Sequence, residues 1–185
     1  MTCITLPLLI LLAAGAYLYN RFVRLDNMSK EGWSGIDVQL KRRYDLIPNL
    51  VQITKEYMPH ERKLLTEIAE KRTEAMKFEQ PSSEKQDAEN KLSETLQSVF
   101  ALSESYPDLK ANTVFQNLQM ALIDVEDHLQ KARRYYNATV RDFNTAVNSF
   151  PFLIVAHMCH FESKPFFEII EQEHKNVKVS LHETH

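Results

Sequence analysis

An uninterrupted apolar stripe between Phe115 and Phe150 constrains the fold of this chain more than any other feature. Its members follow one another by three or four residues, ten times in succession: Phe115, Leu118, Leu122, Val125, Leu129, Ala132, Tyr136, Val140, Phe143, Val147 and Phe150. This is the period of an α-helix with one buried face. A helix from Asn112 to Ser149 would be about 57 Å long at about 1.5 Å per residue. The stripe therefore predicts long helices of this chain packed side by side, and a second copy of the protein is a further candidate to cover it.

The rest of the chain supports an all-α class. Only 3 glycines and 7 prolines occur in 185 residues, too little turn chemistry for a fold of many short hairpins. We predict a four-helix-type antiparallel bundle over residues 25–167, followed by a polar tail over 168–185. Its helices are predicted at about 25–77, 83–106, 109–149 and 152–167. The first contains Pro48 and Pro59, which are expected to kink it.

Residues 1–24 are predicted to form a single transmembrane helix with its flank. Ile4 to Tyr19 is uncharged and largely apolar, and about 19 uncharged residues from the first position approach the roughly 20 that cross a bilayer core. The small residues 14–16 also fit a signal-peptide cleavage site, but no Lys or Arg precedes the apolar run. Arg21 and Arg24 follow it, so the positive-inside rule places the N-terminus outside and the body in the cytoplasm.

Several patterns resemble parts of catalytic or metal-binding sites. His60-Glu61 begins like a zinc-protease motif, but the second His four residues on is replaced by Leu64. His157 and His160 flank Met158 and Cys159, and a soft metal is one interpretation of them; a packed apolar end segment explains them as well. No nucleophile–base pair emerges from any motif, so we expect no enzyme activity, no cofactor and no metal.

Two polar patterns on the predicted helices point to contacts rather than chemistry. Lys41, Arg42 and Arg43 could bind lipid phosphates, although Asp37 and Asp45 partly neutralise them and favour a solvated, salt-bridged face. Gln130, Asn137 and Asn144 recur every seven residues beside the stripe. Polar residues at such positions often fix the register of neighbouring helices, and recognition of a partner is the alternative.

Four sequence strings, with His60-Glu61, resemble the LemA family in order and spacing, from the apolar N-terminus to about Phe167. They are IDVQLKRRYDLIPNLV at 36–51, ESYPDLKAN at 104–112, ARRYYN at 132–137 and FNTAVNSFP at 143–151. Pro59 departs from the family pattern, which has a small residue before His-Glu, and the segment after Phe167 has no evident counterpart.

The resemblance implies a bacterial membrane protein of undefined function, with a short N-terminal anchor and an all-helical body. Some relatives belong to magnetosome formation, and others are encoded near a membrane zinc protease. We therefore expect a non-enzymatic scaffold or adaptor in the bacterial inner membrane that self-assembles or binds a membrane protein such as a protease, and no nucleic acid. A lipid-shaping protein and a metal-dependent enzyme are the alternatives. The positions expected to contact a partner or lipid are Lys41, Arg42, Arg43, Asn49, His60, Glu61, Asn112, Arg133, Asn137 and Asn144.

Overall fold

The computed structural model describes residues 2–168; within that range the side chains of residues 2–4, 7 and 8 lie outside the description, and so does the predicted tail over 169–185. The described chain is built from helices and holds no strand, which confirms the all-α class. The helices are α1 (Thr2–Tyr57), α2 (Arg62–Ala75), α3 (Ser83–Ser103), α4 (Pro107–Ala111), α5 (Thr113–Asn148) and α6 (Phe152–Cys159).

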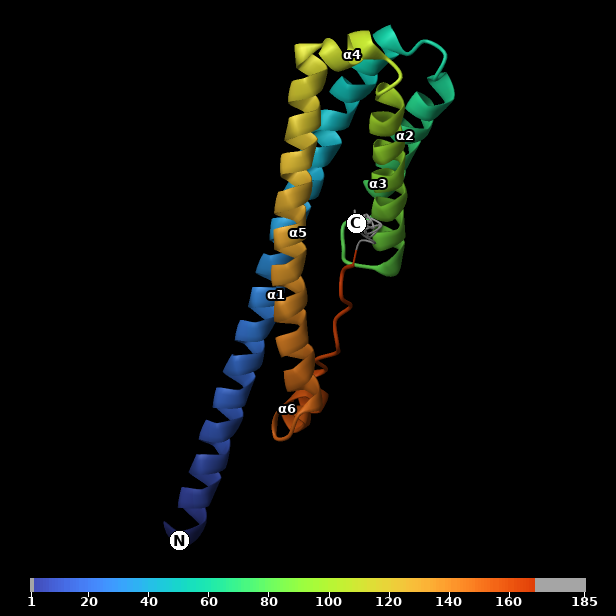
Figure 1. Ribbon diagram of the computed structural model, residues 1–185. Coiled ribbons are helices and arrows are strands. Elements are labelled where there is room, and N and C mark those ends of the chain that lie inside the picture. The colour runs from blue at the N-terminus through green and yellow to red at the C-terminus, as the bar shows by residue number, and fades with distance from the viewer. Residues whose placement is uncertain (1, 169–185) are drawn as a thin grey trace, which may run out of the picture.

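Four of these helices run antiparallel to their neighbours in an elongated body (Figure 1). α1 and α5 lie side by side over most of the length of α5, and α2 and α3 form a second pair that joins the first through α2 and α1. The short α4 crosses one end of the body, and α6 packs against α1 and α5 at the other end. The N-terminal part of α1 projects beyond α6.

The prediction of one kinked helix over 25–77 is wrong. α1 ends at Tyr57, and the chain turns through Met58–Glu61 into α2, which runs back along α1. Pro59 explains the break, because proline disfavours the helical conformation of the residue before it and clashes with the preceding turn. The break supplies the body with two antiparallel helices where the sequence suggested one rod.

Pro48 does not end α1, which continues for nine more residues. A proline has no N–H, so the carbonyl of Tyr44, four residues earlier, loses its helical partner. The guanidinium of Arg72 on α2 donates to that carbonyl through Nε at 2.7 Å. The proline therefore creates an acceptor that ties α2 to α1.

The apolar stripe of α5 is buried, as its spacing predicts, except at Ala132, which is half-buried, and Phe150, which lies beyond the helix and is 83% exposed. α1 covers it along most of its length. The two helices approach closely at Gly32, where an added Cβ would lie 3.0 Å from the Cα of Tyr136. Because the cover comes from the same chain, the stripe does not require a second copy.

Two further helix predictions need correction. The helix predicted over 109–149 is divided at Asn112 into α4 and α5. The helix predicted over 152–167 ends at Cys159, because His160 adopts a left-handed conformation with φ of 57°. Residues 161–168, which we call the C-terminal strap, then run back along α5 without regular secondary structure (Figure 1).

Among the residues whose side chains are described, no helix combines the length and the apolar character needed to cross a membrane. The transmembrane helix predicted within residues 1–24 is thus not found there. Part of that segment, residues 1–4, 7 and 8, lies outside the described side chains.

Candidate functional site

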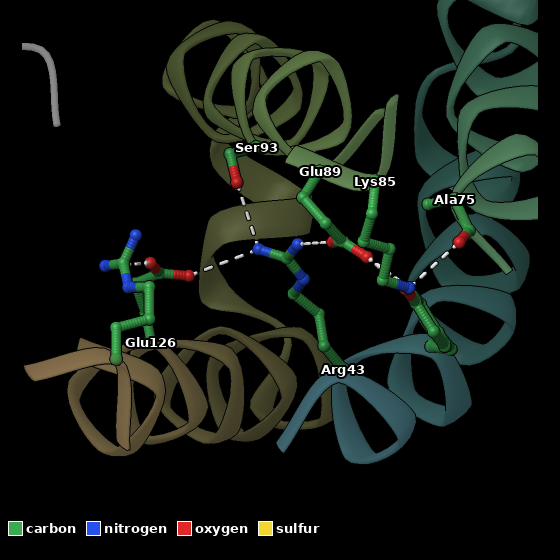
Figure 2. Close-up of polar contacts among 8 residues, drawn as sticks. Arg43, Ala75, Lys85, Glu89, Ser93 and Glu126 are labelled. Carbon is green, nitrogen blue, oxygen red and sulfur yellow. Dashed lines mark hydrogen bonds and ion pairs between the residues drawn. The ribbon is translucent and has the colours of Figure 1, made fainter. Parts of the chain in front are cut away.

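A cluster of charged side chains lies inside the body, between α1, α3 and α5 (Figure 2). Arg43 of α1 is 1% exposed, Lys85 of α3 is 2% exposed, and Glu89, one turn further along α3, has no exposed surface. Charged groups lose their hydration when they are buried, so such side chains persist only where partners compensate the charge. We call these residues, with Tyr44 and Glu126, the buried charge cluster.

Glu89 is the centre of the cluster, and both of its oxygens are occupied. Oε2 accepts from the guanidinium of Arg43, while Oε1 accepts from the hydroxyl of Tyr44 and lies 3.1 Å from the ammonium of Lys85. Lys85 also donates to the Tyr44 hydroxyl at 2.7 Å and to the carbonyl of Ala75 at 2.9 Å. Since Ala75 is the last residue of α2, the cluster connects α1, α2 and α3.

Arg43 extends the cluster to α5. Its Nη1 donates to the hydroxyl of Ser93 at 3.0 Å and to the carboxylate of Glu126 at 3.2 Å (Figure 2). The Glu126 side chain is 45% exposed and also lies 3.6 Å from the guanidinium of Arg133. Glu126 therefore marks the edge where the cluster meets solvent.

Burial and the carboxylate of Glu89 together keep the tyrosine of the cluster protonated. Burial raises the pKa of Tyr44 well above the ordinary value, and the carboxylate of Glu89 raises it further. The hydroxyl consequently stays protonated and donates to Glu89. With both oxygens of Glu89 engaged, the cluster ties α1, α2 and α3 together, and Glu89 has no surface exposed to solvent.

The sequence predicted a solvated face for the cluster Lys41-Arg42-Arg43, and this is correct for two of its members. Lys41 pairs with Asp37 at 2.7 Å, and Arg42 pairs with Asp124 of α5 at 2.9 Å; Lys41 and Arg42 are both exposed. For Arg43 the prediction is wrong. Arg43 lies three residues after Leu40 and four before Ile47, both buried, so it occupies a core position of α1 where an apolar side chain would be expected.

Sequence reasoning missed Tyr44, Lys85, Glu89, Ser93 and Glu126. Their signal is a charge at a core position. Lys85 and Glu89 continue the stripe of α3 through Leu92, Leu96 and Val99, all buried, at steps of three and four. Opposite charges at core positions of two helices, here α1 and α3, predict a buried ion pair. The sequence does not show which helices face each other, so the partners become known only from the fold.

Other sequence-predicted positions gather at the end that carries α4. Asn112 caps α5, accepting through Oδ1 from the N–H groups of Val114 (2.8 Å) and Phe115 (3.1 Å), and donates to the Tyr57 hydroxyl at 3.0 Å. Glu61 accepts from the Tyr106 hydroxyl at 3.3 Å. Asn112 and Glu61 thus join helix ends within the chain. His60 and Asn49 are exposed on the turn after α1 and on α1 itself.

Asn137 and Asn144 hold the backbone of the C-terminal strap. Asn144 donates to the carbonyl of Lys164 (2.9 Å) and accepts from its N–H (2.8 Å). Asn137 makes the same pair of bonds with Phe167, at 3.1 Å and 2.9 Å. Seven helical residues span about 10.5 Å, and three residues of any chain reach about 10–11 Å at most, so the strap is nearly fully extended between them. These amides set a register, but with the strap rather than between helices.

The strap is also held by its side chains. Phe167 is fully buried and packs edge-on against Trp33, with ring centroids 5.2 Å apart, and the Tyr136 hydroxyl donates to the carbonyl of Pro165 at 3.0 Å. Lys164 pairs with Asp26 of α1. Burial opposes ionisation of Asp26, but its bonds to Lys164 and Lys30 prevail and lower the pKa of the carboxyl.

The metal hypotheses find no support within residues 2–168. No three His, Cys, Asp or Glu side chains of the described part gather as a ligand set. His157 and His160 are exposed, as is Cys159, which is not in a disulfide.

Glu89→Ala is expected to lower the free energy of unfolding by roughly 3–5 kcal/mol, because it leaves Arg43 and Lys85 buried without their carboxylate. Urea unfolding followed by circular dichroism measures the loss. Glu94→Ala is the matched control, since Glu94 lies on the same helix but is exposed; its effect should stay within about 0.5 kcal/mol. Equal effects of the two substitutions would contradict the role of the cluster.

Tyr136→Phe is expected to change stability in alkali. Burial raises the pKa of Tyr136 to about 12, whereas an unfolded tyrosine ionises near 10. Between pH 10 and 12 the unfolded chain therefore releases a proton that the folded chain keeps, and stability falls as pH rises. Unfolding measured from pH 8 to 11.5 should show a shallower decline for Tyr136→Phe. Tyr135→Phe, at an exposed neighbour, should leave the decline unchanged.

Asn137→Ala is expected to release the end of the strap, because the Phe167 N–H loses its acceptor. Hydrogen exchange followed by NMR should show the Phe167 amide exchanging at least tenfold faster. The control is Asn117→Ala, an exposed asparagine on the same helix, which should leave that rate unaltered. Protection of Phe167 that survives Asn137→Ala would show that packing alone holds the strap.

Comparison of the sequence with known proteins identifies its family. The model of the LemA family matches residues 32–181. The match begins after the N-terminal apolar run and continues past Phe167, where the sequence resemblance was expected to end.

Curated relatives match most of the chain at low identity. Magnetosome protein MamQ 2 of Paramagnetospirillum magneticum (strain ATCC 700264 / AMB-1) is 23% identical over 177 residues, which covers 81% of this chain and 64% of the relative. Magnetosome protein MamQ of Magnetospirillum gryphiswaldense (strain DSM 6361 / JCM 21280 / NBRC 15271 / MSR-1) is 23% identical over 176 residues, covering 80% of this chain and 64% of the relative. The chain thus spans slightly under two thirds of the length of these relatives. With the family model matching most of its length, the chain belongs to the LemA family.

Proposed function

We propose that this chain is a non-enzymatic scaffold, tethered to a membrane by the N-terminal part of α1 and presenting its helical body to a protein partner. One observation carries the proposal. The N-terminal part of α1 projects from the body with its large apolar side chains uncovered: Leu6, Leu9, Ile10, Leu11, Leu12 and Tyr17 are 62–70% exposed.

The distribution of these side chains favours lipid over a single partner helix. Residues 9–12 are four successive positions, which point in all directions around an α-helix. A protein partner covers one face of a helix, whereas hydrocarbon surrounds it. A helix that is apolar all round is typical of a membrane environment.

The polar groups of the body that form the buried charge cluster or hold helix ends and the strap have structural roles. The buried charged side chains pair with one another. Asn112, Asn137 and Asn144 form hydrogen bonds within the chain. The relatives are magnetosome proteins by name. The chain covers only 64% of the length of these relatives. We therefore do not assign a magnetosome role to this chain. Self-assembly, a membrane protease as partner and a cytoplasmic body stay predictions.

Leu9→Asp combined with Leu12→Asp is expected to move the chain from the membrane to the soluble fraction. A charged residue at the centre of a membrane helix costs about 2.5–3.5 kcal/mol. The measurement is fractionation of bacterial cells expressing the full chain, followed by a carbonate wash that strips peripheral proteins and leaves inserted ones.

The matched control is Val38→Asp combined with Ile123→Asp, which adds the same charge at two body positions that are each 56% exposed. This variant should stay with the membrane. The proposal fails if the unsubstituted chain is soluble, or if the two variants fractionate alike.

A further inference from the structure

A second apolar surface remains uncovered at the end of the body that carries α6. Phe150 is 83% exposed, Leu153 49%, Ile154 54% and Met158 74%. Along α6 these residues alternate with Phe152, Val155 and Ala156, which pack on the body beside Phe22. The short helix therefore packs one apolar face on the body and turns a second, largely apolar face outward, on which the exposed His157 also lies. We call the outward residues Phe150, Leu153, Ile154 and Met158 the α6 apolar face.

The position of α6 along α1 is fixed by aromatic contacts. Phe161, just after α6, stacks on Phe22 with centroids 4.9 Å apart and lies 6.3 Å from the ring of Tyr19. Phe152, the first residue of α6, meets Phe22 at 5.7 Å. These contacts place α6 at the point where the uncovered apolar part of α1 ends, and α1 projects past it (Figure 1).

The charges at this level suit a bilayer surface. Arg21 and Arg24 are exposed on α1 on either side of Phe22. The exposed carboxylates nearby in the sequence are Glu162, beside Phe161, and Asp142, which pairs with the exposed Arg141. Arginines just beyond an apolar segment contact lipid phosphates. The α6 apolar face thus continues the apolar surface of α1 at the depth where apolar and charged groups meet.

We propose that the α6 apolar face seats in the interfacial layer of the bilayer that holds the N-terminal part of α1. The inference rests on the proposed membrane tether and adds a second, independent point of contact. Interfacial helices bury an apolar face about 5–10 Å into the boundary between headgroups and acyl chains. Two contacts far apart in the sequence fix the tilt of the body against the membrane, which a single helix does not.

The test places a fluorophore at two positions of equal exposure in the full chain. Cys3 and Cys159 are replaced by Ser, and one new cysteine is introduced by Ile154→Cys on α6 or by Val114→Cys at the α4 end, each native residue being 54% exposed. Both are labelled with the environment-sensitive fluorophore NBD and reconstituted into phosphatidylcholine–phosphatidylglycerol vesicles. Half of the vesicles contain lipids with a nitroxide at a shallow acyl position.

Flotation of the vesicles comes first, so that the two proposals fail separately. A chain that does not float with the vesicles overturns the tether and the α6 contact together. In floated samples, quenching at position 154 is expected to exceed that at position 114 at least threefold, with blue-shifted emission. Equal quenching at both positions overturns the α6 contact and leaves the tether intact. A blue shift at 154 without lipid quenching also overturns it, because a second copy then covers the face.

Discussion

The arrangement of the helices depends on how one carboxylate is neutralised in the interior. Glu89 has no contact with solvent, and the cost of burying its charge is offset only when Arg43 and Lys85 stand at its two oxygens. Those cations come from different helices, and Lys85 reaches the end of α2 as well. A rotation or slip of α3 by one residue would separate the charges. An apolar core tolerates such shifts far better, so the cluster selects one register among several that packing alone would allow.

Away from this cluster the body is held by other means. At the α4 end, Asn112 and Glu61 join the ends of helices. Toward α6, the strap lies beside α1 and α5 where both α2 and α3 are absent, since α2 ends at Ala75 and α3 begins at Ser83. Phe167 fills the space beside Trp33 that a helix would otherwise occupy. The middle of the molecule is thus held by contacts within the chain, although Oε1 of Gln39 and Nε of Arg43 are buried there without a hydrogen-bond partner. Consecutive uncovered apolar side chains lie on the projecting part of α1 and on α6, while those of the body, such as Val38 and Ile123, are scattered.

The sequence predicted the parts of this fold that repeat. A stripe of ten steps is enough to define α5, and its burial follows from its composition. The break at Pro59 was harder to predict, because a proline can kink a helix or end it, and the outcome depends on whether the following segment has a face to pack against. Arg43 was misjudged because its neighbours Lys41 and Arg42 are solvated and local charge patterns do not show which side of a helix meets α3. The role of Asn137 and Asn144 was out of reach, since their partners are backbone atoms that any sequence possesses.

The spacing of Asn137 and Asn144 has a consequence for how the chain can vary. Seven residues of the α5 helix are as long as three residues of the extended strap, so both asparagines meet the strap backbone at once. A shift of the strap by one residue would break the hydrogen bonds of both asparagines with the strap backbone. The two pairs of hydrogen bonds therefore form together or not at all. The segment between Asn144 and Lys164 contains α6, but it belongs to neither of the two stretches whose lengths have to match. Residues can therefore be added to or removed from the turns of that segment while both amides stay engaged, as long as Phe152 and Phe161 keep their contacts with Phe22.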